Sequence, residues 1–115
     1  MKIGKKEKGA VIIYSLEGRI DFHPFDLLDE SVLKDALESD RKYVILDFSE
    51  LKYISSLGIR YIYDIKNKLT KQGIKFAIVK VSDAVIQVFK LLGLMETFSI
   101  YEKEEDAIQS FGVGN

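Results

Sequence analysis

The chain has no cysteine and, among its 115 residues, only one histidine and one proline, His23 and Pro24. Without cysteine there are no disulfides, thiolate nucleophiles or thiolate metal sites, which favours an intracellular protein. One histidine and scattered carboxylates give no metal-ligand spacing, so neither a metal nor another cofactor is expected. Proline-rich linkers and internal repeats are also missing, and the length fits a single domain with a core over about residues 10–111.

The sequence also lacks long apolar runs and an excess of one charge. No apolar run approaches the about 18 residues of a membrane-spanning helix, and lysines surround Ile3 where a signal peptide would be hydrophobic. Seventeen basic and 18 acidic residues give a formal net charge of −1, so no overall field attracts nucleic acid or an anionic membrane. We expect a soluble, cytoplasmic protein that binds neither and recognises its partner through a local patch.

Motifs of the common enzyme classes are missing as well. A serine hydrolase would need His23 as the base for Ser55 or Ser56. However, Ile54 stands two residues before Ser56, where a G-x-S-x-G elbow requires glycine. The G-x-x-x-x-G-K and G-x-G-x-x-G nucleotide motifs are absent too. We therefore expect a protein that is not an enzyme.

Asp47 follows an apolar run and so lies at the predicted end of a strand, as the phosphorylated aspartate of a receiver domain does. That reading needs an acidic magnesium-binding cluster from another strand, and Glu17 alone is a poor substitute for one. We interpret Asp47 as a buried, turn-forming aspartate.

The segments that are present alternate between strand and helix. Residues 2–8 read as a solvated edge strand or a frayed terminus rather than as a binding site. The first buried strand is expected to stop at Glu17-Gly18, and the first helix to bury Phe25, Leu28, Val32, Ala36 and Leu37. Strands are expected at 10–16, 43–48, 74–79 and 98–101, and helices at 25–38, 56–71, 82–92 and 104–111. This alternation indicates the α/β class, with helices packed on a mixed sheet of about four to five strands.

The serine pair Ser55-Ser56 precedes the second predicted helix, whose buried face carries Ile59, Ile62, Ile65 and Leu69. One serine is expected at the N-cap, where its hydroxyl satisfies an unpaired backbone N–H. A helix N-terminus also favours negative charge, so a phosphate on Ser56 would be well accommodated there. Spacing alone leaves open whether this serine is only a cap or is modified.

The run from Asp47 to Arg60 resembles the signature of the STAS domain family, the anti-sigma factor antagonists, usually written D-L-S-x-L-x-x-I-D-S-S-G-L. In that family the serine after the aspartate at the helix start is phosphorylated by a partner kinase. The alignment on Asp47, Ser49, Leu51 and Ile54 puts Ser56 at that position. Ser55 replaces the family's aspartate and is a rival acceptor, while Leu57 and Gly58 stand where the family has serine and glycine.

Two more segments extend the resemblance to about residues 10–111. Gly18-Arg19-Ile20-Asp21 is similar to the family's glycine-x-hydrophobic-aspartate, which lies beside the phosphorylated serine, so Asp21 is a candidate partner-binding residue. The alternative for Asp21 is a helix-initiating acid ahead of Pro24. The run from Ser82 to Leu94 resembles the family's third helix. The resemblance implies helices mainly on one face of the sheet, with the first strands at an edge.

The outward face of the second predicted helix carries a row of charges. Arg60, Asp64 and Lys68 recur at i, i+4 and i+8, close to Tyr61. Internal salt bridges would explain this row without any function. We favour partner docking because exposed arginine and tyrosine are enriched at interfaces and this face begins at Ser56.

The resemblance implies a switch protein rather than an enzyme. Its unphosphorylated form would bind an anti-sigma factor with serine kinase activity, phosphorylation on Ser56 would release it, and a phosphatase would reset the switch. The alternative is a STAS scaffold or small-ligand-binding domain in which Ser56 is only a cap. The candidate partner-binding residues are Asp21, Ser55, Leu57, Gly58, Arg60, Tyr61 and Asp64.

Overall fold

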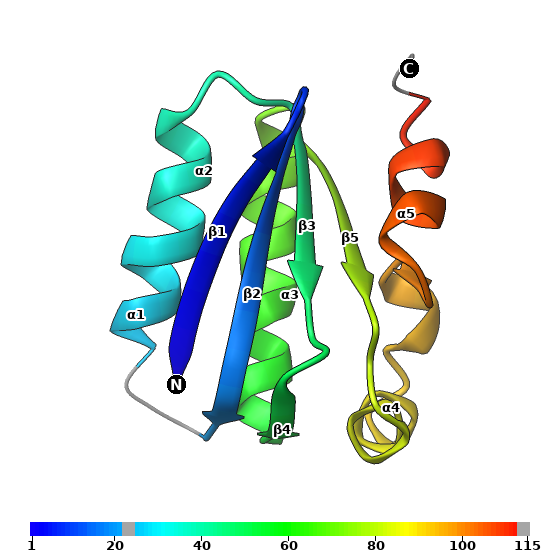
Figure 1. Cartoon of the computed structure of the whole chain (residues 1–115). Coiled ribbons are helices and arrows are strands. Elements are labelled where there is room, and N and C mark those ends of the chain that lie inside the picture. Colours follow the sequence, from blue (N-terminus) through cyan, green and yellow to red (C-terminus); the bar gives the residue numbers. More distant parts are fainter. Residues whose placement is uncertain (22–24, 113–115) are drawn as a thin grey trace.

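The fold is built on a six-stranded mixed sheet, seen in a computed structural model that describes residues 1–21 and 25–112 (Figure 1). The strand order is β1-β2-β3-β5-β6, and β4 pairs with β2. Strand β1 is antiparallel to β2, and the other pairings are parallel. The strands are β1 (Lys2–Lys8), β2 (Val11–Ile20), β3 (Tyr43–Asp47), β4 (Leu51–Ile54), β5 (Lys75–Val79) and β6 (Ile100–Tyr101). The predicted α/β class is confirmed, with one strand more than expected because residues 51–54 pair as β4.

The helices lie mainly on one face of this sheet. One continuous helical segment, α1-η1-α2, joins β2 to β3, and α3 and α4 follow the next two strands of the chain. Their buried residues share one apolar core with the inner face of the sheet, whereas Ala107 of α5 and Phe111, directly after α5, pack on the outer face against Val11, Ile13 and Ile45. The bounds are α1 (Asp26–Leu28), η1 (Asp29–Lys34), α2 (Asp35–Glu38), α3 (Ser56–Lys71), α4 (Asp83–Leu91), η2 (Met95–Thr97) and α5 (Glu104–Ser110).

Strand β2 does not stop at Glu17-Gly18, so that prediction was wrong. Gly18 has a φ of +102°, which glycine adopts readily, and the pairing register with β4 shifts between Gly18 and Arg19. The Gly18 N–H donates to the Glu50 carbonyl at 3.0 Å. The strand bends here and continues to Ile20, which brings Asp21 to the start of α3.

The predicted buried face of the first helix was wrong at Leu37, whose side chain is 41% exposed. Segment η1 is π-helical, and the buried residues Leu28, Val32 and Ala36 recur at every fourth position. Leu37 comes one position after this row and points away from the core, while Leu33 is buried in its place.

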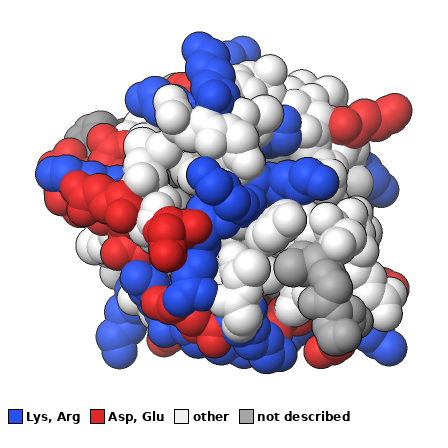
Figure 2. Space-filling view, turned by 90° about the horizontal axis from the view of Figure 1, so that it is seen from above, with Lys and Arg blue, Asp and Glu red and all other residues white. Residues whose placement is uncertain are grey.

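Ion pairs connect the edge strand to the rest of the domain. Figure 2, which looks down on the end of the molecule where the β1–β2 turn lies, shows basic and acidic side chains next to each other. Arg41 binds Glu7, and Lys5 lies 2.8 Å from Asp35. Glu104 of α5 is 4% exposed and accepts hydrogen bonds from Lys8 at 2.5 Å, with Lys6 at 3.2 Å. Residues 2–8 therefore form an ordered edge strand, as one of the two readings expected.

No helix in the described part of the chain has the length and apolar character needed to cross a membrane.

Candidate functional site: the start of helix α3

Ser55 connects the ends of β2, β4 and α3. Its backbone N–H donates to the Ile20 carbonyl at 2.8 Å. Its hydroxyl donates to the Asp21 carbonyl at 2.6 Å and accepts from the Gly58 N–H at 3.0 Å, which makes Ser55 the N-cap of α3. The sequence correctly predicts a serine cap. The idea that Ser56 provides it was wrong, because only the preceding residue has the extended backbone of a cap (φ −81°, ψ 165°).

Ser56 is the first residue of α3 and its side chain is exposed. Within residues 1–21 and 25–112, its hydroxyl has no hydrogen-bond partner. The two serines thus differ in chemistry although they are neighbours. The Ser55 hydroxyl is held by a donor and an acceptor, whereas the Ser56 hydroxyl is accessible and lies where the helix dipole favours negative charge.

Gly58 lies beneath the surface, against the ends of β2 and β4. A Cβ atom on Gly58 would lie 2.8 Å from Cγ2 of Ile20 and 2.9 Å from Cγ1 of Ile54, closer than carbon atoms pack. The residue is buried, so the structure places this candidate partner-binding residue inside the domain. Its role here is to let the first turn of α3 approach the strands.

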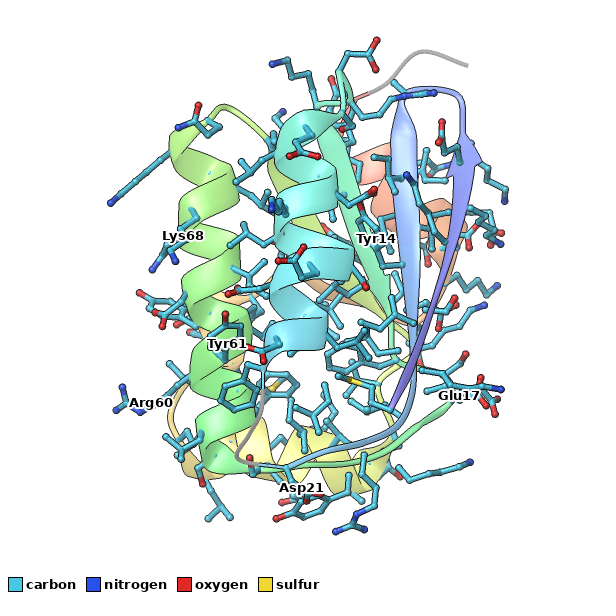
Figure 3. All side chains as sticks on the ribbon, turned by 90° about the vertical axis from the view of Figure 1, so that its left-hand side faces the viewer. Tyr14, Glu17, Asp21, Arg60, Tyr61 and Lys68 are labelled. Carbon is cyan, nitrogen blue, oxygen red and sulfur yellow. The ribbon has the colours of Figure 1, made fainter. Side chains whose placement is uncertain are left out.

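The outward face of α3 carries Leu57, 54% exposed, together with the exposed charged residues Arg60, Asp64 and Lys68. Figure 3 shows Arg60 and Lys68 projecting from this helix. No ion pair joins any two of these three charged side chains, all of which the structure describes. Internal salt bridges therefore do not explain the row, and the charges are available to a partner.

Tyr61 is placed differently from the expectation of an exposed docking residue. Its side chain is half-buried and turned towards the first helix, where its hydroxyl donates to Asp29 and its ring stacks on Phe25 with centroids 4.5 Å apart (Figure 3). Burial and the hydrogen bond to Asp29 raise the pKa of the Tyr61 hydroxyl above its usual range. Tyr61 thus fixes α3 against α1 and η1 from below the surface.

Asp21 lies next to this helix start and is exposed (Figure 3). Its carboxylate lies 3.6 Å from the guanidinium of Arg19, which itself sits over the Tyr53 ring at 4.4 Å from the centroid. Asp21 is not a helix-initiating acid, because α1 begins five residues later at Asp26. Sequence reasoning missed Arg19 and Tyr53 as neighbours of the site, although Arg19 is part of the Gly18–Asp21 motif. His23 and Pro24 lie outside the described residues.

The STAS domain family model matches residues 2–107. The chain belongs to the STAS domain family. A curated relative is the anti-sigma F factor antagonist of Paenibacillus polymyxa, 23% identical over 117 residues that cover 98% of this chain and 97% of the relative. Antagonism of an anti-sigma factor is a regulatory function, not an enzymatic one.

Solved structures show the same fold. The anti-sigma factor antagonist SpoIIAA in its unphosphorylated form has a TM-score of 0.79 and 19% identity, covering 99% of this chain and 100% of that one. The phosphorylated form of SpoIIAA, described as a Bacillus cell fate determinant, has a TM-score of 0.70 and 18% identity, covering 96% and 99%. An anti-sigma factor antagonist from Mycobacterium paratuberculosis has a TM-score of 0.82 and 22% identity, covering 95% and 92%.

Three remaining observations on this STAS domain bear on other functions. Asp47 is buried and accepts a 2.8 Å hydrogen bond from the Ser49 N–H, which confirms the turn-forming aspartate. No group of three possible metal ligands occurs among residues 1–21 and 25–112. A hollow of about 420 Å³ lies between the C-terminal end of α3 and α5, and its lining includes Thr70, Lys75 and Phe111. It is at the opposite end of the 16-residue helix α3 from Ser56.

Proposed function

We propose that the protein is a cytoplasmic anti-sigma factor antagonist controlled by phosphorylation of Ser56. The unphosphorylated form binds an anti-sigma factor with serine kinase activity, so that the sigma factor is freed. Transfer of the terminal phosphoryl group of ATP to Ser56 Oγ, with release of ADP and the hydroxyl proton, ends the interaction. A phosphatase hydrolyses the phosphate ester and resets the switch.

The observation that carries this proposal is the difference between the two serines. Phosphoryl transfer needs a hydroxyl that a kinase can reach, and the Ser56 side chain is exposed on the first turn of α3. The Ser55 hydroxyl would have to give up its hydrogen bonds to Asp21 and Gly58 before it could react. This favours Ser56 over Ser55 as the acceptor, independently of the resemblance to the family.

The candidate partner-binding residues fall into two sets in this proposal. Asp21, Leu57, Arg60 and Asp64 are exposed around Ser56 and would contact the anti-sigma factor. The exposed Arg60 suits an interface because arginine is enriched among the residues that contribute most to binding, and the neighbouring exposed Leu57 adds apolar area. Ser55, Gly58 and Tyr61 support this surface from below through the cap, the close packing and the Asp29 hydrogen bond.

Release follows from the charge that phosphorylation adds. A phosphoserine carries about −1.5 to −2 charges at pH 7. An interface centred on Leu57 would have to bury these charges, and their desolvation is costly unless the partner supplies cations. The modification therefore acts locally and needs no change of fold.

The test uses a cognate kinase-type anti-sigma factor with ATP and three variants of this chain. Wild type and Ser55→Ala are expected to incorporate phosphate, whereas Ser56→Ala is expected to bind the partner without being phosphorylated or released. Ser56→Asp, a partial mimic, is expected to bind at least tenfold more weakly, about 1.4 kcal/mol. Phosphorylation of Ser56→Ala together with none of Ser55→Ala would show that the acceptor is Ser55.

If neither alanine substitution changes phosphate incorporation or release, and Ser56→Asp binds the partner as tightly as wild type, the protein acts as a STAS scaffold or small-ligand module instead. The hollow beside α5 is the specific feature that would then be examined first, because it combines Lys75 and hydroxyl groups with the aromatic rings of Phe76 and Phe111.

A further inference from the structure

We propose that Arg60 binds the phosphate group of phosphorylated Ser56 within the same chain, one turn further along α3. Arg60 would thus contact the phosphate after modification, and before modification its charged side chain is exposed on the surface. The physical contact can be tested on its own, but its regulatory meaning rests on the proposed function.

The helix geometry brings the two side chains together. Ser56 and Arg60 are i and i+4 residues of α3, and such pairs lie about 5–6 Å apart between their Cβ atoms. Side chains on a helix lean towards its N-terminus, so the long Arg60 side chain extends back over the turn that begins with Ser56. A negative group N-terminal to a positive one at this spacing is the favourable order.

Arg60 is free to make this contact. Its side chain is exposed and projects from α3 into solvent (Figure 3). It forms no ion pair with any residue in the described ranges 1–21 and 25–112, although Asp64 follows it at i+4. A guanidinium group also presents a planar set of N–H donors that suits a phosphate better than an ammonium group does.

The other charged and titratable groups near Ser56 are less available or unfavourable. Arg19 already lies between the Asp21 carboxylate, at 3.6 Å, and the ring of Tyr53, at 4.4 Å from its centroid. Asp21 is negative and would repel the phosphate. Lys52 is exposed but belongs to β4, before the cap. Arg60 is the first cation after Ser56 on the same helix, and among residues 1–21 and 25–112 it has no ion-pair partner.

The contact has a consequence for the switch. In the unphosphorylated protein the Arg60 guanidinium can reach an acidic group of the partner. After phosphorylation the phosphate binds the same guanidinium. The surface then has additional negative charge, and Arg60 can no longer bind an acidic group of the partner. A charge change at one side chain thereby alters two positions of the docking surface.

The experiment measures the second pKa of the phosphate by ³¹P NMR in protein that carries phosphoserine at position 56 from translation. A nearby guanidinium favours the dianion and lowers this pKa from its usual value near about 6. We expect Arg60→Gln to raise it by about 0.3 pH units, the size that i,i+4 ion pairs produce. Arg60→Lys should raise it less, and Lys68→Gln, two turns further along the same face, should leave it unchanged.

Arg19→Gln provides the second control. If the second pKa of the phosphate rises in Arg19→Gln but not in Arg60→Gln, the phosphate contacts Arg19 and the proposal is wrong. The same pKa in all variants would also overturn it. Circular dichroism of each variant checks that α3 is intact. Because phosphoserine is incorporated without the kinase, this result is independent of the proposed function: the contact can exist even if the cell never phosphorylates Ser56, and it can be absent from a working switch.

Discussion

At the scale of single residues, the two serines at the start of α3 carry different tasks. Ser55 caps the helix and also donates a hydrogen bond to the Asp21 carbonyl, and Ser56 has an exposed side chain. We expect Ser55→Ala to lower the free energy of unfolding by about 1 kcal/mol, the usual cost of a lost cap. Ser56→Ala should change it by less than about 0.5 kcal/mol, as exposed substitutions usually do.

Urea unfolding of the two variants side by side is the measurement. Each serves as the control for the other, because both remove one hydroxyl from the same turn. An equal loss in both, or a larger loss in Ser56→Ala, would mean that Ser56 shares the capping role, and the argument that its hydroxyl is reserved for phosphorylation would fail.

Gly58 gives a second residue-scale prediction. A methyl group here would lie 2.8 Å from Ile20 and 2.9 Å from Ile54. Over-packing of this kind costs about 1–3 kcal/mol, more than the gain of roughly 0.5–1 kcal/mol from replacing glycine inside a helix. Gly58→Ala is therefore expected to be less stable than wild type in thermal unfolding, whereas Leu57→Ala, on the exposed side, should not be. A stabilised Gly58→Ala protein would contradict the close packing.

The role of a site residue could be predicted where local interactions determine it, but not where contacts between residues far apart in the sequence do. The serine pair before a helical pattern indicates a cap because capping is local. Which serine takes the cap depends on the Asp21 carbonyl, 34 positions away in sequence, to which Ser55 donates. The burial of Gly58 likewise depends on Ile20, which no local pattern connects to it.

At the scale of elements, α5 is held to the edge strand through one buried carboxylate. Glu104 is 4% exposed; burial would raise the pKa of its carboxyl, but hydrogen bonds from Lys8 and Lys6 outweigh it and keep the pKa below the ordinary 4.5. A carboxyl with a depressed pKa in the folded state stabilises the fold above its unfolded-state value. That contribution is lost as the pH falls below about 4.5 towards the folded-state value.

We expect Glu104→Gln to be less stable than wild type at pH 7 and to lose less stability on acidification. Urea unfolding at pH 7 and at successive values below pH 4.5 measures both. The pKa of Asp35 is also lowered, but Asp35 is present in both wild type and Glu104→Gln. The difference between their free energies of unfolding as the pH changes therefore reports on Glu104. Glu105→Gln is the matched control, because the neighbouring carboxylate is exposed. Parallel pH profiles for wild type and Glu104→Gln would show that Glu104 does not stabilise the fold through its ion pairs with Lys6 and Lys8.

The order of the elements could be predicted from the sequence, but their irregularities could not. Alternating apolar patterns indicate strands and helices because each element has to bury one side against the sheet. The glycine after Glu17 indicates the end of a strand from sequence alone. In the structure β2 continues past Gly18, because its next residues pair with β4 after a bulge. Segment η1 is π-helical and departs from the 3.6-residue period of an α-helix, so that period misplaces Leu37.

At the scale of the whole molecule, the site combines segments distant in sequence. The bend at Gly18 places Asp21 at the start of α3, and Ser55 and Ser56 follow β4 directly. The α1-η1 segment holds α3 through the hydrogen bond from Tyr61 to Asp29. The exposed face of α3 then offers a leucine and charged side chains near an accessible hydroxyl. In the proposed function, a phosphate there changes the charge of the surface that binds the partner.

The most direct test of this account is the affinity of the cognate anti-sigma factor for the protein with serine and with phosphoserine at position 56. Isothermal titration calorimetry is expected to show binding for the serine form and a loss of at least tenfold for the phosphoserine form, with matching circular dichroism spectra. Phosphoserine at position 110, on α5 and far from the docking surface, is the control and should bind like wild type. Equal affinity of the serine and phosphoserine-56 forms would contradict the central claim that phosphorylation of Ser56 releases the partner.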